Sequence, residues 1–177
     1  MSRLPLATLD RIPPSFREFM ERRGDLNVFR LLANAPAVCG GWARMTDQML
    51  DSPTFTRRMR ELVILRVAHL QESGYERAQH LPLARQAGVT PAQIDAVTGD
   101  GDLDSAGFDD TEIIVLELVS ELCTTRKARD GTFAAAHAAL GTEAVTELLM
   151  IVSLYYGLAL ILNAVELDID EHSRLGA

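Results

Sequence analysis

The sequence is poor in the residues that usually mark disulfide-stabilised, zinc-binding or nucleic-acid-binding proteins. It has two cysteines in 177 residues, Cys39 and Cys123, and they belong to no CxxC or Cys/His cluster. This excludes a disulfide framework, offers no zinc site and fits reduced thiols in a cytoplasm. Lys and Arg number 17 against 25 Asp and Glu, for a net charge of -8. Because nucleic-acid binders need a basic face, we expect no nucleic-acid partner.

Aromatic residues and strand signals are also scarce. Phe, Trp and Tyr make up 6% of the chain, so the core must consist mostly of Leu, Val, Ile and Ala. There is no sustained polar/apolar alternation and no Asn-Gly hairpin, which favours an all-α protein. We expect one domain over residues 1–177, with the Gly- and Asp-rich stretch 99–110 as its main loop. Helices are expected over about 15–23, 26–32, from near Pro36 through 50, 56–71, 74–87, a short stretch from 90, 110–126, 130–140 and 142–167.

One apolar stretch is long enough to raise the question of a membrane span. The 18 residues between Glu147 and Glu166 carry no charge. Polar residues interrupt this stretch, no Lys or Arg flanks it, and its length is at the short limit for crossing about 30 Å of hydrocarbon. We therefore predict a buried helix and no membrane partner. The amino-terminal residues MSRLPLATLDRIPPSF hold no continuous apolar run, so we predict no signal peptide and a cytoplasmic location. A helix this apolar in a small protein also suggests an oligomer.

Residues 61 to 80 gather the side chains best suited to chemistry. Glu61 and His69 share one face of the predicted helix 56–71, and Glu76 and His80 share one face of the next. A short Ser-Gly turn joins the two helices, so they should pack antiparallel. That packing could bring Glu61 and His80 together at the base of a pocket, where a carboxylate tunes an imidazole for proton transfer.

Structural explanations for the same residues remain open. Ser73 and Glu76 fit the capping box S-x-x-E, in which each side chain binds the backbone N–H of the other residue. His80 alone could be a core histidine with a satisfied hydrogen bond, and His69 could be structural or exposed. An E-x-x-x-H pair can supply two metal ligands, but no further His or Asp is clustered nearby, so we expect no metal and no cofactor.

The segment 57–94, which contains the run RMRELVILRVAHLQESGYERAQHLPLARQAGVTPAQI, resembles the carboxymuconolactone decarboxylase family, which includes alkylhydroperoxidase D-like proteins. A looser resemblance extends to NVFRLLANAP before it and to LYYGLALILNAVELD near the end. The resemblance implies a compact all-helical fold that assembles as a homotrimer or homohexamer.

Thiol-dependent members of this family carry the site E(x11)CxxCxxxH. On this sequence the glutamate falls on Glu61, the cysteines on Ser73 and Glu76, and the histidine on His80. A serine hydroxyl is too weakly acidic to replace the attacking thiolate, so thiol peroxidase activity by the usual route is not expected. Members of the decarboxylase branch carry a glutamate four residues before the histidine, as here.

Relatives often have an arginine three residues before Asn163, where this chain has Leu160. That absence puts recognition of a carboxylated substrate in doubt, although Arg60 or Arg66 could replace it.

Three hypotheses follow. The first is a cofactor-independent acid–base enzyme that decarboxylates or isomerises a small cyclic or unsaturated carboxylic acid or lactone. The second is a peroxidase-like oxidoreductase that uses Cys39 or Cys123, and the third is a non-catalytic, oligomeric ligand-binding protein. For the enzyme, the catalytic candidates are His80, Glu61 and Glu76, and the pocket or supporting candidates are Ser73, Tyr75, Arg66, His69, Tyr155 and Asn163.

Overall fold

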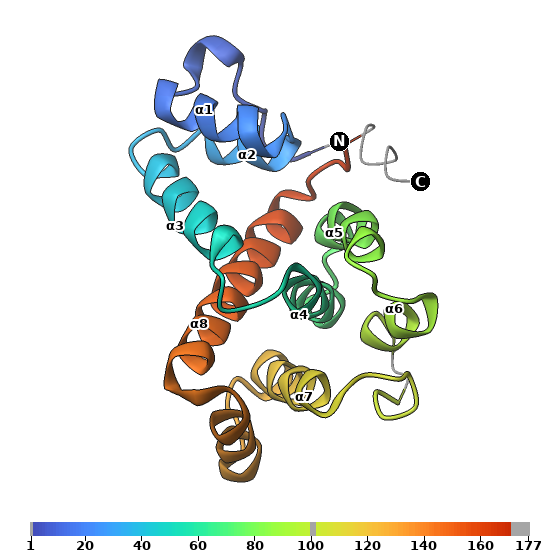
Figure 1. The fold of residues 1–177 in the computed structure, drawn as a ribbon. Helices are drawn as coiled ribbons and strands as arrows, with labels where there is room; N and C mark the ends of the chain where they lie inside the picture. Colours follow the sequence, from blue (N-terminus) through green and yellow to red (C-terminus); the bar gives the residue numbers. More distant parts are fainter. Residues whose placement is uncertain (1, 100–101, 171–177) are drawn as a thin grey trace.

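The computed structural model describes residues 2–99 and 102–170, and α-helices dominate this part of the chain (Figure 1). No strand occurs within these ranges, as the sequence predicts. After a 3-10 turn at Leu9–Arg11, the α-helices are α1 (Pro14–Arg23), α2 (Asn27–Leu32), α3 (Cys39–Asp51), α4 (Arg57–Leu70), α5 (Gly74–Gln86), α6 (Pro91–Val97), α7 (Asp110–Thr125) and α8 (Asp130–Val165). The predicted loop 99–110 is non-helical at residue 99 and over 102–109, α7 begins at Asp110, and residues 100–101 lie outside the described ranges.

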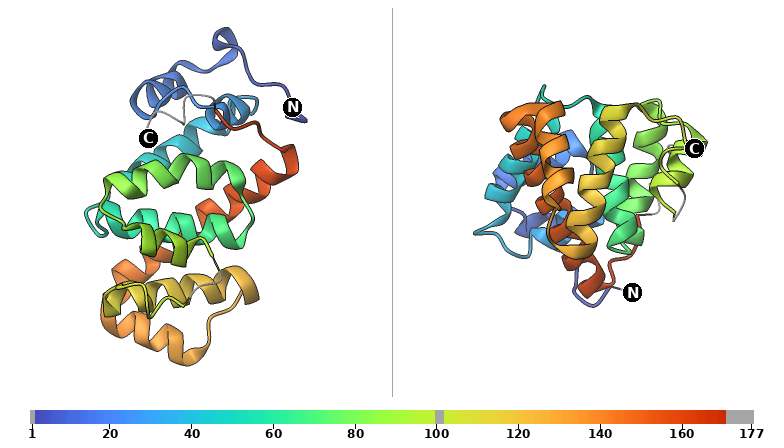
Figure 2. Two further views of the ribbon diagram at one scale, coloured as in Figure 1. Left: turned by 90° about the vertical axis from the view of Figure 1, so that its right-hand side faces the viewer. Right: turned by 90° about the horizontal axis from the view of Figure 1, so that it is seen from below.

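Helix α4 is the centre of the molecule. It packs against α5, α7 and α8, and the first two views of the ribbon agree in placing it between the amino-terminal helices and α7 (Figures 1 and 2). The four residues 62–65 are all buried, which is what a helix needs when it is covered on every side. A charged residue on such a helix, Glu61, therefore has to find its partners inside the protein.

Helix α8 spans 36 residues and bends at Gly141, whose φ of 77° is left-handed. The bend separates the two helical segments that the sequence predicts on either side of residue 141. Length and composition alone would let α8 cross a membrane, but half of its most apolar stretch is buried within the fold. The exposed side chains Leu160 and Ile161 leave an apolar surface on α8. The expected contact between copies of the chain stays a prediction.

The amino-terminal helices α1 to α3 form their own apolar layer beside α8. Phe16, Phe19, Phe29 and Trp42 pack ring against ring, with Phe19 and Phe29 centroids 4.8 Å apart at 76°. Such edge-to-face pairs stabilise the layer beyond the area they bury. The chain has few aromatic residues, and it concentrates four of them here, next to the cavity described below.

Candidate active site

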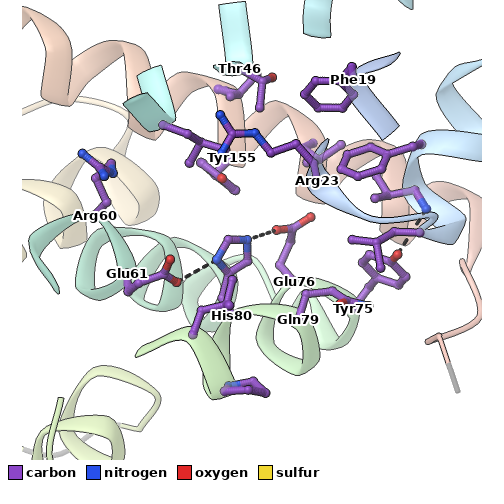
Figure 3. A pocket seen from close by; sticks show the side chains of 18 of the residues that line it. Phe19, Arg23, Thr46, Arg60, Glu61, Tyr75, Glu76, Gln79, His80 and Tyr155 are labelled. Carbon is purple, nitrogen blue, oxygen red and sulfur yellow. Dashed lines mark hydrogen bonds and ion pairs between the residues drawn. The ribbon is translucent and has the colours of Figure 1, made fainter. Parts of the chain in front are cut away.

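A cavity of about 710 Å³ lies between the amino-terminal layer and helices α4, α5 and α8. Its walls combine an aromatic and aliphatic side, a carboxylate-and-imidazole side and several arginines (Figure 3). The lining residues are Phe19, Arg22, Arg23, Leu26, Val28, Phe29, Trp42, Thr46, Leu50, Arg57, Arg60, Glu61, Tyr75, Glu76, Gln79, His80, Pro82, Leu83, Gln86, Leu154, Tyr155 and Leu158. A mostly apolar cavity with a few convergent polar groups is the usual form of a small-molecule site.

His80 stands between two buried carboxylates. Its Nδ1 lies 2.8 Å from Oε2 of Glu61, which comes from α4, and its Nε2 lies 3.4 Å from Oε2 of Glu76, one turn earlier on α5. Glu61 and Glu76 are only 4% and 3% exposed. The antiparallel packing of α4 and α5 thus produces the Glu61–His80 contact that their sequence spacing predicts.

The two carboxylates decide the charge of the imidazole. Burial works to lower the pKa of His80, but the negative charges of Glu61 and Glu76 and their hydrogen bonds outweigh it and raise the pKa from 6.5 to about 10. At neutral pH, His80 is therefore an imidazolium ion with a carboxylate at each ring nitrogen. The three groups together carry a net negative charge beside the cavity.

Only half of the predicted capping box at Ser73 is formed. Its hydroxyl accepts a hydrogen bond from the N–H of Glu76 at 3.4 Å, as the motif requires. The predicted return bond from the Glu76 side chain to the Ser73 N–H is wrong, because that N–H donates to the carbonyl of Ala68 instead. The Glu76 carboxylate is therefore free of the cap and turns toward His80 and the cavity (Figure 3).

Four predicted supporting residues lie outside the cavity lining. Ser73 caps α5, and Asn163 donates to the carbonyl of Gln71 at 2.7 Å, holding the turn between α4 and α5. Arg66 points to α7 and the end of α6, where it donates to Ser120 and to the carbonyl of Gly99, so it cannot replace the missing arginine of the relatives. His69 also lies away from the cavity.

Several residues that line the cavity are not predicted from the sequence, because they come from the amino-terminal helices. Arg23, on α1, reaches the cavity while its Nε and Nη2 bind Asp47 and Asp51 of α3 at 2.8 Å each. Arg60 of α4, which the sequence leaves as one possible replacement, does line the cavity. No local spacing connects α1 with α5, so the sequence gives no signal that Arg23 reaches the cavity.

Both cysteines are remote from this cavity. Cys39 belongs to the amino-terminal apolar layer and Cys123 to the core between α7 and α8, and both are buried. Burial raises the pKa of both thiols, that of Cys123 to about 11. Neither therefore has the low pKa that a reactive cysteine needs. Across residues 2–99 and 102–170, no group of three or more His, Cys, Asp or Glu is arranged to hold a metal ion.

Known proteins resemble this chain in two ways, through a family match over part of the sequence and through a fold shared over nearly all of it. The model of the carboxymuconolactone decarboxylase family matches residues 36–108, which include α3 to α6 and the whole of the His80 cluster. No curated protein matches the chain in sequence.

Solved structures resemble the chain over nearly its whole length. An uncharacterised peroxidase-related protein from Ralstonia eutropha, described as having an alkylhydroperoxidase AhpD core, superposes with a TM-score of 0.82 at 19% identity and covers 98% of this chain and 95% of its own. A peroxidase-related protein from a Silicibacter species gives 0.81 at 12% identity, with 97% and 93% covered. The debrominase Bmp8, as a cysteine-to-alanine variant with 2,3,4-tribromopyrrole, gives 0.82 at 12%, with 99% and 97% covered. Residues 36–108 are therefore similar to the carboxymuconolactone decarboxylase family, and the chain has an AhpD-like fold over nearly its whole length.

Proposed function

We propose that this protein is a cofactor-independent acid–base enzyme that moves a proton at a carbon atom of a small, unsaturated or cyclic carboxylic acid or lactone. Isomerisation and decarboxylation are the two reactions of this class. One observation carries the proposal: an imidazolium between two buried carboxylates, whose residues all line a cavity of about 710 Å³. Strongly perturbed titratable groups in such a cavity are typical of catalytic sites.

The three side chains would have different roles. Glu61 holds the His80 ring through Nδ1 and keeps it charged. His80 then presents its Nε2–H to Glu76 and stabilises that carboxylate where it faces the cavity. Glu76 would take the proton from the substrate carbon and return it to a second carbon, which is isomerisation. In a decarboxylation, the Nε2–H of the His80 imidazolium would pass its proton through Glu76 to the carbon that CO₂ has left, and the imidazole would regain a proton from water.

The basic residues of the cavity support an acidic substrate. Arg23 and Arg60 both line it, and Nη1 of Arg60 donates to the carbonyls of Ser52 and Phe55 at 3.0 and 2.6 Å, which fixes the guanidinium in place. A carboxylate bound by these groups would leave the apolar body of the substrate against Trp42 and Leu158. The cavity also counts against a purely structural protein, for which a buried Glu61–His80 pair would need no space beside it.

The reaction class can be tested without the natural substrate. A panel of small unsaturated lactones and carboxylic acids is incubated with the protein in D₂O, and NMR follows deuterium uptake at carbon and loss of CO₂. We expect turnover of at least one compound to fall about a hundredfold in Glu76→Gln, because the amide cannot accept the proton. Glu117→Gln, which changes an exposed glutamate on α7, is the matched control. Equal turnover in the wild type and in Glu76→Gln and His80→Gln would refute the proposal.

A further inference from the structure

Two tyrosines line the cavity, and their hydroxyl groups are in opposite situations. Tyr75 precedes Glu76 on α5, and Tyr155 lies on α8 across from it (Figure 3). Both are buried, at 4% and 6% exposed. Because the two side chains are similarly buried, burial alone would give both phenols the same need for a hydrogen-bond partner.

The hydroxyl of Tyr75 is fully used within the protein. It accepts from the N–H of Val28 at 3.1 Å and donates to the carboxylate of Asp170. Val28 stands at the start of α2, and its neighbour Asn27 donates its own N–H to Asp170 at 2.8 Å. Tyr75 and Asp170 thus satisfy the first N–H groups of a helix whose N-cap residue, Leu26, has no side chain able to do so.

The hydroxyl of Tyr155 has no hydrogen-bond partner among the described residues. Its ring is nevertheless held in a defined position, because it meets the imidazole of His80 edge to face, with centroids 5.3 Å apart at 88°. An unpaired phenol O–H on a residue that lines the cavity, with its ring packed against His80, is available to hydrogen-bond a ligand there.

Charges on both sides of Tyr155 define what this hydroxyl can do. Burial raises its pKa well above 10, and the nearby carboxylates of Glu76 and Glu61 raise the pKa further, while Arg60 and Arg23 act in the opposite direction. The phenol therefore keeps its proton at neutral pH and acts as a hydrogen-bond donor. Arg60 supplies positive charge at the cavity, where an oxygen that gains negative charge would be stabilised, whereas the charge of Arg23 is paired with two aspartates of α3.

We propose that Tyr155 is a catalytic residue that donates a hydrogen bond to the carbonyl oxygen of the substrate while Glu76 removes a proton from the adjacent carbon. This role rests on the proton-transfer function proposed above, and it narrows the substrate to compounds in which a carbonyl group is conjugated with the reacting carbon. Enones, unsaturated lactones and their carboxylated forms belong to this class.

The step balances within the groups named. The C–H bond of the substrate breaks, its proton passes to the Glu76 carboxylate, and its electron pair moves onto the carbonyl oxygen to form an enolate. Tyr155 keeps its proton and shares it with that oxygen through the hydrogen bond. Return of the proton from Glu76 to another carbon restores the carbonyl group and the starting state of both residues. Loss of a donor of this kind typically lowers turnover by about a hundredfold or more.

Two small probes separate the oxyanion contact from general binding. Tetronic acid is a cyclic enol that is anionic at neutral pH and resembles the enolate, whereas the parent butenolide is the neutral lactone without that oxygen. Binding of each is measured by calorimetry to the wild type, Tyr155→Phe and Tyr75→Phe. We expect Tyr155→Phe to weaken tetronate binding at least tenfold relative to butenolide. Glu76→Gln should bind tetronate at least as tightly as the wild type, because the amide resembles the protonated carboxyl group.

Tyr75→Phe is the control for structural effects. It should lower the midpoint of urea unfolding, because Val28 and Asp170 lose their partner, and leave the tetronate-to-butenolide ratio unchanged. Tyr155→Phe should leave the midpoint unchanged, because no bond within the protein is lost.

An unchanged ratio in Tyr155→Phe, or a wild type that binds neither probe, overturns the role of Tyr155. If Glu76→Gln still abolishes deuterium uptake in that case, the proton-transfer function stands without it. If Glu76→Gln exchanges like the wild type, the proton-transfer function itself fails, and the catalytic role of Tyr155 falls with it.

Discussion

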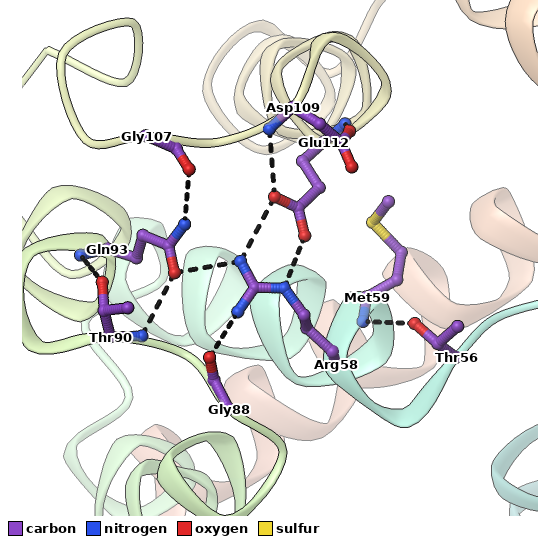
Figure 4. Close-up of polar contacts among 9 residues, drawn as sticks. All are labelled: Thr56, Arg58, Met59, Gly88, Thr90, Gln93, Gly107, Asp109 and Glu112. Atoms are coloured by element: carbon purple, nitrogen blue, oxygen red, sulfur yellow. Dashed lines mark hydrogen bonds and ion pairs between the residues drawn. The ribbon is translucent and has the colours of Figure 1, made fainter.

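Helix α4 carries two polar clusters one turn apart, and the first of them is complete within the protein. The guanidinium of Arg58 binds both carboxylate oxygens of Glu112, the side-chain oxygen of Gln93 and the carbonyl of Gly88, at 2.7 to 3.2 Å (Figure 4). Glu112 and Gln93 in turn cap α7 and α6. The cluster joins three helices, its charges cancel, and each guanidinium nitrogen has a partner.

The second cluster, around Glu61 and His80, is incomplete by the same measures. Two carboxylates serve one imidazole, so the charges do not cancel, and the neighbouring Tyr155 hydroxyl has no partner within the described residues. This cluster also borders the large cavity, which Arg58 does not line. Because a second buried carboxylate beside one imidazole adds like-charge repulsion, the second cluster is hard to explain by stability alone. The contrast supports a structural role for Arg58 and a chemical one for His80.

The largest effect on stability should follow from breaking the complete cluster. Arg58→Met would leave the buried Glu112 carboxylate without a cation and the Gly88 carbonyl without a donor, and Oε1 of Gln93 would keep only the Thr90 N–H. Removing one partner of a buried pair is strongly destabilising, and we expect a loss of about 3 kcal/mol in the free energy of unfolding. Urea denaturation measures it, with Arg77→Met on the exposed face of α5 as the control. A change below that of the control would contradict the structural role.

The second prediction concerns the pH dependence that the incomplete cluster imposes. The folded-state pKa of His80, about 10, lies above its ordinary value of 6.5. Its charged form therefore stabilises the fold fully below pH 6.5, and this contribution is lost as the pH rises through about 10. Glu61→Gln should lower the pKa of His80 in an NMR titration and flatten this part of the stability curve, at a cost of about 2 kcal/mol near neutral pH.

Glu117→Gln, on the exposed side of α7, should keep the wild-type slope over the same pH range. An unchanged pKa of His80 in Glu61→Gln would mean that the two groups are not electrostatically coupled. The contact between them would then be a structural hydrogen bond only.

Much of the fold could be predicted because local signals and long-range packing agree. Thr90 followed by Pro91 marks the start of α6, and Gly88 after α5 takes the left-handed conformation that ends a helix, with a φ of 84°. The 3-10 turn at Leu9–Arg11 has no signature in the sequence, since three residues between prolines give no periodic signal. The bend at Gly141 was anticipated as a break between helices, because glycine alone tolerates that conformation at little cost.

The candidate site was predictable only where it depends on two adjacent helices. The spacing on α4 and α5 predicted the contact between Glu61 and His80, and the distance of 2.8 Å confirms it, whereas the catalytic role of the pair stays a prediction. The second half of the capping box was wrong because the backbone already satisfies the Ser73 N–H. Arg23 was missed because its place in the cavity depends on how α1 packs, which local sequence does not encode.

A smaller effect on stability is expected at Ser73, where the cap of α5 can be distinguished from the ion pair between Glu76 and His80. Ser73→Ala removes the hydroxyl that accepts from the Glu76 N–H, at a cost of about 1 kcal/mol in the free energy of unfolding. Thr90→Ala removes the N-cap hydroxyl from the complete capping box of α6, and its cost in the free energy of unfolding should be as large or larger. The distinguishing measurement is the NMR titration of His80. It should be unchanged in Ser73→Ala, because Glu76 makes its ion pair independently of the cap; a lowered pKa would show that the cap positions the carboxylate.

The smallest effect is expected at Asn163, which the family resemblance placed near the site and the structure places behind it. Its side-chain amide is exposed and donates one hydrogen bond to the carbonyl of Gln71, at the end of α4. An exposed bond of this kind contributes about 0.5 kcal/mol, so Asn163→Ala should shift the urea midpoint only slightly. Because the bond holds the turn that leads into α5 without touching Glu61 or His80, both the pKa of His80 and the tetronate-to-butenolide ratio should stay at their wild-type values. A change in either value would show that the turn between α4 and α5 helps to position the Glu61–His80 site.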